Sequence, residues 1–185
     1  MKVLLRKFYT NDTKDVAKNL LGKTLIRKIG NQTLSGIITE TEAYKGKNDP
    51  ASHSSRKKTE RNKIMFGEVG HAYVYFTYGM HYCFNVVAKK HVDESGAVLI
   101  RAIQPQQGVN HMIKNRNTDV LSNLANGPGK LTQAMQITLK QYNHDVTKKS
   151  SLFIIDGKRP ARIIAKPRIG IKIGNDKLWN FSYKI

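Results

Sequence analysis

The sequence is poor in cysteine and has no long apolar segment. Cys83 is the only cysteine among 185 residues, so no internal disulfide can form, which is typical of proteins from a reducing compartment. No apolar run approaches the roughly 20 residues that cross a bilayer. Charged residues at Lys2 and Arg6 interrupt the N-terminus too early for a secretory signal. We therefore expect a cytoplasmic protein without membrane contact.

Acidic residues are also scarce. The chain has 13 Asp and Glu against 32 Lys and Arg, which gives a formal net charge of +19. Such an excess repels itself unless a polyanion is nearby, and nucleic acid is the usual partner. A basic surface without a partner, or a ribosome-associated protein, would show the same excess. Charge therefore favours a nucleic-acid partner but does not distinguish DNA from RNA.

Metal-ligand patterns, internal repeats and linkers are missing as well. The six histidines and the one cysteine have no spacing typical of a zinc or iron site. Without a repeat, a low-complexity tract or a linker, the chain is expected to form one domain over residues 1–185. With 39% hydrophobic residues it can build a core of its own.

Strand patterns outnumber helix patterns along the chain. A capped amphipathic helix is predicted between Asp12 and Gly22, and further helices near 107–115 and 129–137. Residues 46–70 read as a long loop with a short helix. Strands are predicted at 24–29, 34–44, both arms of 72–87, 97–103, and near 152–155, 161–165 and 168–173. No regular strand–helix alternation is present, so the expected fold is α+β with a curved, mostly antiparallel sheet.

The segment 38–44 carries two of the few acids. Glu40 and Glu42 are two residues apart, so in a strand their side chains share one face, and Asp49 follows closely. A carboxylate in a cleft can activate water and stabilise a cationic transition state. The alternative is an exposed strand face with ordinary salt bridges. Periodicity alone does not choose between Glu40 and Glu42.

Tyrosines are concentrated in the segment 72–87. Tyr73 and Tyr75 alternate on one strand face, and Tyr78 lies beside Gly79 at the expected turn. A rigid ring at a hairpin tip can enter a base stack and hold a gap open. Core packing, or a tyrosine that is satisfied within its turn, explains the same pattern without DNA.

Taken together, these segments resemble the alkyladenine class of 3-methyladenine DNA glycosylases. The similarity runs from about residue 10 to the C-terminus in the family's order. The matching stretches are Glu40-Thr41-Glu42-Ala43-Tyr44, Ala51-Ser52-His53-Ser54, Arg61-Asn62 with Met65-Phe66, Tyr73-Val74-Tyr75 through Tyr78-Gly79-Met80, Asn85, Val98-Leu99-Ile100-Arg101-Ala102, Gly127-Pro128 with Lys130-Leu131, and Arg168-Ile169-Gly170.

The resemblance implies a single domain with flanking helices, whose protruding β-hairpin enters the minor groove of DNA. It implies a monofunctional base-excision-repair enzyme without cofactor. Such an enzyme flips alkylated or deaminated purines from double-stranded DNA and leaves an abasic site. A monomer suffices because one chain supplies the site, and the location would be cytoplasmic and nucleoid-associated.

The resemblance also implies roles for individual residues. Glu42 would act on the attacking water, with Arg101 nearby. The base pocket would be formed by Tyr44, Ala51, His53, Tyr75 and Asn85, with Asn85 narrowing it against guanine. Tyr78 and Met80 would enter the DNA stack, and Arg61, Lys130 and Arg168 would contact the DNA backbone.

Some features leave questions open. The resemblance selects Glu42, so Glu40 is left to orient basic neighbours or to stabilise the fold. Glu60 stands where many relatives are expected to have proline, and the turn 89–95 is slightly longer than the family's pattern. These departures affect the expected substrate range most.

Two rival functions fit parts of the sequence. A non-catalytic RNA- or ribosome-binding module explains the charge, and a phosphodiesterase would need metal ligands that the spacing does not provide.

Overall fold

An antiparallel sheet is the centre of the molecule, and the computed structural model describes it within residues 2–184. The ends of the predicted domain, Met1 and Ile185, lie outside the described residues. The strands are β1 Thr24–Ile29, β2 Gln32–Lys45, β3 Ala72–Thr77, β4 His81–Val87, β5 Gly96–Gln107, β6 Leu152–Ile155, β7 Ile164–Lys166 and β8 Asn180–Ser182. The α-helices are α1 Thr13–Leu20, α2 Val109–Arg116 and α3 Pro128–Ala134. Short 3₁₀ helices are η1 Arg6–Tyr9, η2 Lys63–Phe66, η3 Leu121–Asn123 and η4 Leu139–Gln141.

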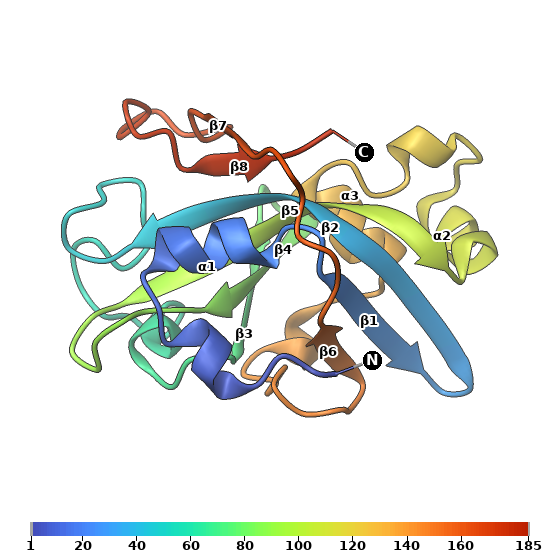
Figure 1. The fold of residues 1–185 in the computed structure, drawn as a ribbon, viewed down its shortest axis with the longest axis horizontal. Coiled ribbons are helices and arrows are strands. Elements are labelled where there is room, and N and C mark those ends of the chain that lie inside the picture. The colour runs from blue at the N-terminus through green and yellow to red at the C-terminus, as the bar shows by residue number, and fades with distance from the viewer. Residues whose placement is uncertain (1, 185) are drawn as a thin grey trace.

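The strands follow the order β3-β4-β5-β2-β1-β6, and β8 joins β2 with β7 at its outer side. All described strand pairs are antiparallel. The long strand β2 pairs with β5 through register shifts at Ser35/Gly36 and around Glu40, and such irregularities bend a sheet. In Figure 1 the sheet curves behind α1, and β7 and β8 lie along its upper edge. The predicted α+β fold with a curved antiparallel sheet is confirmed.

Helix α1 covers one face of this sheet. The carboxylate of Asp12 caps the helix by accepting a hydrogen bond from the backbone N–H of Lys14. Val16, Ala17 and Leu20 are buried on the sheet side. The hydroxyl of Thr41 in β2 donates to the carbonyl of Ala17 at 2.8 Å. Because alternate residues of a strand point to opposite faces, the neighbours of Thr41 in the sequence are turned away from this helix.

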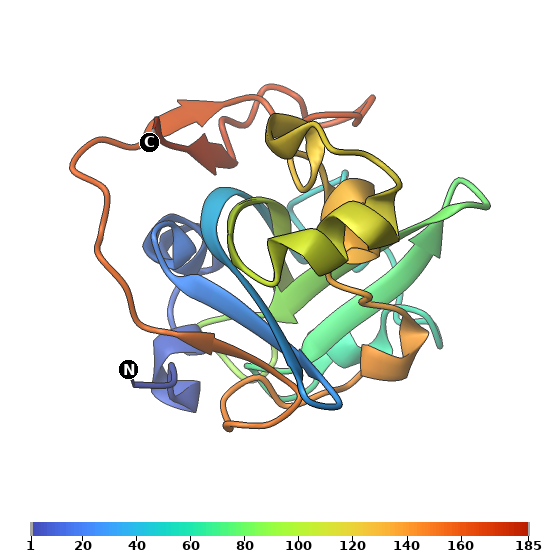
Figure 2. The same ribbon diagram turned by 90° about the vertical axis from the view of Figure 1, so that its right-hand side faces the viewer.

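The hairpin of β3 and β4 extends from the body of the molecule (Figure 2, green). Tyr78 and Gly79 at its turn have φ values of 52° and 67°, and the N–H of Met80 donates to the carbonyl of Thr77. Two successive residues with positive φ are typical of the type I′ turn, whose twist matches that of a hairpin. The predicted turn around residues 78–80 is confirmed.

Two sequence predictions near the C-terminus need correction, and one strand was missed. Residues 168–173 were expected to form a strand but contain turns and bends, because buried Arg168 anchors the segment and Gly170 has a φ of 75°. The strand expected at 161–165 is shorter and later, at Ile164–Lys166. The three-residue strand β8 was not expected at all. In the described part of the chain, no helix is long and apolar enough to cross a membrane.

Candidate active site

One row of cross-strand neighbours forms the floor of the site. Tyr73 pairs with Asn85, Asn85 with Leu99, Leu99 with Glu42, and Glu42 with Asn180. Directly paired residues of adjacent strands point to the same face of a sheet. Five strands thus place these side chains side by side, on the face opposite to α1. The sequence separations in this row, up to 138 residues between Glu42 and Asn180, explain why local patterns do not reveal it.

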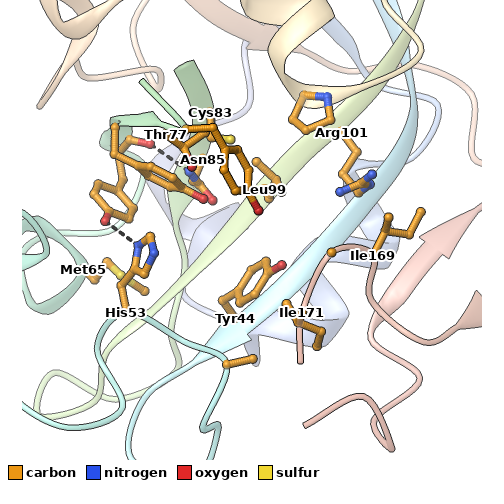
Figure 3. Close-up of a pocket in the computed structure, with 16 residues that line it drawn as sticks. Tyr44, His53, Met65, Thr77, Cys83, Asn85, Leu99, Arg101, Ile169 and Ile171 are labelled. Atoms are coloured by element: carbon orange, nitrogen blue, oxygen red, sulfur yellow. Dashed lines mark hydrogen bonds between the residues drawn. The ribbon is translucent and has the colours of Figure 1, made fainter. Parts of the chain in front are cut away.

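Above this row lies a cavity of about 320 Å³, which is at the lower end of the range for small-molecule sites. All five residues that the resemblance assigned to a base pocket line it: Tyr44, Ala51, His53, Tyr75 and Asn85. Arg101 and Tyr78 line it as well. Figure 3 shows His53 and Met65 on one side of the cavity and Arg101 and Ile169 on the other.

Glu42 is fully buried directly behind the cavity wall. Its carboxylate accepts hydrogen bonds from the Tyr44 hydroxyl at 2.6 Å, the Ile169 backbone N–H at 2.8 Å and the Asn180 amide at 3.0 Å. The Arg101 guanidinium lies 3.4 Å away. Three of these four partners, Tyr44, Ile169 and Arg101, line the cavity. The carboxylate is therefore one side chain removed from the space that a ligand would fill.

The two oxygens of Glu42 differ in their surroundings. Oε1 receives the Ile169 N–H and the Asn180 amide and faces Arg101, whereas the described partner of Oε2 is the Tyr44 hydroxyl alone. A carboxylate oxygen has two lone-pair positions. Oε2 therefore has one acceptor position without a partner among the described residues, and its one partner, Tyr44, lines the cavity.

Burial and the negative charge of Glu42 together raise the pKa of Tyr44 well above its ordinary value of 10. The Tyr44 hydroxyl therefore keeps its proton at neutral pH and acts as a donor to Glu42.

Glu40 belongs to the same polar cluster. It accepts a hydrogen bond of 2.7 Å from the Asn180 amide, which also donates to Glu42, and its carboxylate lies 3.4 Å from Nε of Arg101. The β2–β5 pairing shifts register around Glu40, yet Glu40 and Glu42 reach the same Asn180 amide, as expected for two residues on one face of a strand. Like Glu42, Glu40 does not line the cavity, but it contacts neither Tyr44 nor the Ile169 N–H, and its described partners are Asn180 and Arg101.

Three rings form the opposite wall. His53 Nδ1 is 2.8 Å from the Tyr73 hydroxyl, and the His53 ring meets that of Tyr75 edge-on with 4.7 Å between centroids. The ring centroids of Tyr73 and Tyr75 are 5.1 Å apart, and the Arg61 guanidinium lies 4.8 Å from the Tyr75 ring centre. Desolvation, with a smaller effect of Arg61, lowers the pKa of His53 to about 4. Burial raises that of Tyr73 to about 12.

We expect the His53 imidazole to titrate near pH 4 instead of the ordinary 6.5. In the folded protein it is then neutral across pH 5 to 8, so one ring nitrogen can donate a hydrogen bond, the other can accept one, and the ring carries no charge. Because the pKa is depressed on folding, His53 contributes to a loss of stability as the pH falls from about 6.5 toward 4. Imidazole NMR titration, with His53→Gln to assign the signal among six histidines, checks this. A midpoint near 6.5 would contradict it.

Tyr78 and Met80 are at the hairpin tip, with 81% and 68% of their surface exposed. Positive φ is uncommon for a non-glycine residue, and a bulky one at such a position is an outlier that often marks function. Tyr78 also borders the cavity. The tip thus presents a large ring beside the site without a core to receive it.

The three predicted DNA-backbone residues occupy different positions. Arg61 is exposed and stacks on Tyr75, and the half-buried Lys130 donates to the side-chain carbonyls of Asn123 and Asn126. Arg168 is buried and forms two 2.7 Å bonds to Asp49. The expectation that Arg168 contacts the DNA backbone is therefore corrected, because its guanidinium does not reach the surface. Asp49 is likewise committed to this pair and does not join the acidic site.

Sequence reasoning missed two of the donors that hold Glu42, the side-chain amide of Asn180 and the backbone N–H of Ile169. No local signal marks Asn180, since it lies in a strand of only three residues. The buried thiol of Cys83 also lines the cavity, and burial raises its pKa. Within residues 2–184 no group of three or more His, Cys, Asp or Glu side chains is arranged to hold a metal ion.

Known proteins are similar to this chain over nearly its whole length. The family model described as methylpurine-DNA glycosylase matches residues 7–184. A protein of Carboxydothermus hydrogenoformans is 47% identical over 98% of this chain and 95% of its own length. One from Prosthecochloris aestuarii is 47% identical over 95% and 85%, and one from Methanocella arvoryzae 45% over 98% and 92%. All three bear the name "Putative 3-methyladenine DNA glycosylase".

Proposed function

The chain belongs to the methylpurine-DNA glycosylase family, and we propose that it hydrolyses the bond between deoxyribose and a damaged purine flipped out of duplex DNA. The observation that carries the proposal is the cavity wall, where Tyr44 and Arg101 hold the carboxylate of Glu42 directly behind a space flanked by tyrosines and histidine. Aromatic walls suit a planar base, and a buried carboxylate suits the activation of water.

In the proposed reaction, Oε2 of Glu42 accepts a proton from a water molecule while the oxygen of that water attacks C1′ of the sugar. The bond from C1′ to the purine nitrogen breaks, its electron pair leaves with the base, and an abasic site remains. The ionised carboxylate also stabilises the cationic character of the sugar in the transition state. Since Glu42 is fully enclosed in the free protein, we infer that water gains access when the bound nucleoside shifts Tyr44 or Ile169.

The chemistry of the base sets the demands on the other residues. An alkylated purine such as 3-methyladenine is cationic and leaves readily, whereas a deaminated purine such as hypoxanthine is neutral and needs a hydrogen-bond donor. We assign that task to His53 or its backbone N–H, because His53 lines the cavity and its neutral ring suits a base that gains no charge. Asn85, held by a 3.0 Å bond to the Tyr73 carbonyl, is the residue that we propose to discriminate against normal guanine.

Entry of the base is proposed to depend on the hairpin. Base flipping costs a few kcal/mol, less where damage has weakened pairing, and stacking on aromatic side chains contributes about 1–3 kcal/mol per base. Tyr78, with Met80 beside it, fills the space that the base leaves in the stack. The excess of basic residues supplies phosphate contacts, with Arg61 and Lys130 as candidates.

A monofunctional reaction fits the residues at hand. Among the described residues, the cavity lining contains no lysine, so water is favoured over an amine as the nucleophile. We further propose that one chain acts alone on double-stranded DNA, as the first enzyme of base excision repair in the cytoplasm near the nucleoid.

The direct test is to incubate the protein with duplexes that carry 3-methyladenine, 7-methylguanine, hypoxanthine or etheno-adenine and to detect free base and abasic sites. We expect release of at least one damaged purine and no strand cleavage without added base or heat. A matched duplex with normal purines and a single-stranded form serve as controls. Binding without release from any lesion would instead support the non-catalytic nucleic-acid-binding alternative.

A further inference from the structure

A buried ion pair of Asp49 and Arg168 packs against Tyr44, which lines the cavity, although neither of the two charged residues lines it. The side chains of Asp49 and Arg168 are both fully buried, and two bonds of 2.7 Å join them across 119 residues of sequence. Arg168 also donates to the carbonyls of Ala43 at 3.0 Å and Gly174 at 3.2 Å. It is the one ion pair among the described residues in which neither partner has exposed side-chain surface.

Stability alone is a weak reason for this arrangement. The desolvation of two charges often offsets their attraction, so packed apolar residues of similar size would hold the segment about as well. What an apolar pair could not do is fix a planar group in one orientation. The guanidinium of Arg168 accomplishes this through its two-pronged contact with Asp49.

Arg168 reaches two of the donors that hold Glu42. Its guanidinium carbon lies 4.7 Å from the centre of the Tyr44 ring, and the ring of Trp179 is 5.1 Å away. The next residue in the chain is Ile169, whose backbone N–H donates to Oε1 of Glu42. Ile169 itself is 52% exposed, so its own side chain does little to hold this N–H in place. Buried Arg168 supplies that anchor.

We propose that Asp49 and Arg168 are positioning residues, which act through Glu42 by fixing the Tyr44 hydroxyl and the Ile169 N–H against its two oxygens. The proposal rests on the proposed glycosylase function. The guanidinium of Arg168 stacks on the Tyr44 ring and so fixes the orientation of that ring. Because Ile169 is the next residue in the chain, the buried side chain of Arg168 also fixes the position of the Ile169 backbone. The two hydrogen bonds from Arg168 to Asp49 hold the guanidinium itself in place. The Tyr44 hydroxyl and the Ile169 N–H thereby hold the Glu42 carboxylate in one position behind the cavity wall.

The test uses Arg168→Lys and Asp49→Asn, which keep polar atoms at both positions but remove the two-pronged contact. Single-turnover release of a cationic purine is measured at saturating enzyme, because such a base leaves readily and slow variants stay measurable. We expect the rate to fall about 10- to 100-fold, since small misplacement of a catalytic group has effects of this order. Binding of undamaged duplex is expected to stay unchanged.

The decisive readout is a double-mutant cycle with Glu42→Gln. If Asp49 and Arg168 act through Glu42, adding Arg168→Lys to Glu42→Gln lowers the rate little or not at all. Arg6→Lys is the matched control, because Arg6 pairs with Asp145 at 2.8 Å and links distant segments away from the cavity. Thermal unfolding of each variant shows which ones are folded, and Asp49→Asn replaces Arg168→Lys in the cycle if the latter is not.

The outcomes separate the two proposals. Release at the wild-type rate by both variants, or an equal loss with and without the Glu42 carboxylate, would overturn the positioning role while leaving the glycosylase function standing. A wild-type protein that releases no base would overturn the proposed function itself, and the positioning role with it. A loss confined to variants that retain Glu42 supports both.

Discussion

Replacement of Glu42 by glutamine is expected to lower the rate of base release by about a hundred- to ten-thousand-fold, the range typical of a lost general base. The side-chain amide of the new glutamine can still accept a hydrogen bond from the Ile169 N–H and form one with the Tyr44 hydroxyl. The buried network therefore persists and the protein folds. It cannot accept a proton from water at neutral pH or neutralise a cationic sugar. Single-turnover kinetics on a lesion-containing duplex, with lesion binding measured in parallel, checks this.

Glu40→Gln is the matched control, because it makes the same substitution on the same strand two residues away. Neither carboxylate lines the cavity itself, but Glu40 contacts one cavity-lining residue, Arg101, whereas Glu42 contacts three. The loss of Glu40 should therefore reduce release far less. A larger loss from Glu40→Gln than from Glu42→Gln would reverse the two roles. Equal and small losses from both would argue against carboxylate catalysis.

Tyr78→Ala is expected to weaken binding of lesion-containing duplex by roughly 5- to 150-fold, which corresponds to about 1–3 kcal/mol of lost stacking. The ring is 81% exposed and packs against little of the protein, so its removal should leave thermal stability nearly unchanged. Alanine keeps a Cβ at the positive φ of position 78, so the backbone strain there stays about the same. Affinities for damaged and undamaged duplex, measured over a range of salt concentrations, provide the readout.

The undamaged duplex separates intercalation from electrostatics. Phosphate contacts by lysine and arginine set the salt dependence of binding, and Tyr78→Ala leaves these contacts intact. We therefore expect an unchanged salt slope and a smaller loss for undamaged DNA. Tyr78→Phe keeps the ring and should bind like the wild type. Equal losses on both duplexes would mean that Tyr78 shapes the hairpin instead of entering the stack.

Much of the fold follows from local sequence patterns. The cap at Asp12, the hairpin arms around Tyr78 and the strand with Glu42 are all marked by short-range signals and occur where predicted. The failures share one cause. Strand β8 and the turn at 168–173 are defined by pairing with β2 and by the buried contact of Arg168 with Asp49, which no local propensity encodes.

The residues of the candidate site also fall into two groups, those that the sequence could place and those that it could not. Side chains that project from regular strands, such as Tyr75 and Asn85, could be placed from periodicity and resemblance together. Arg168 could not, because an arginine in a basic sequence reads as a surface residue until its buried partner is known. Asn180 became visible only through the register that places it opposite Glu42.

The most direct measurement is a crystal structure of the Glu42→Gln protein bound to a duplex with one hypoxanthine. We expect the damaged base outside the helix, between Tyr44, His53 and Tyr75, with the Tyr78 ring in the vacated position. The side chain at position 42 should lie within reach of a water molecule beside C1′ of the sugar. A base that remains stacked, or a flipped nucleoside whose C1′ is separated from residue 42 by an unbroken wall of Tyr44 and Ile169, would contradict the account.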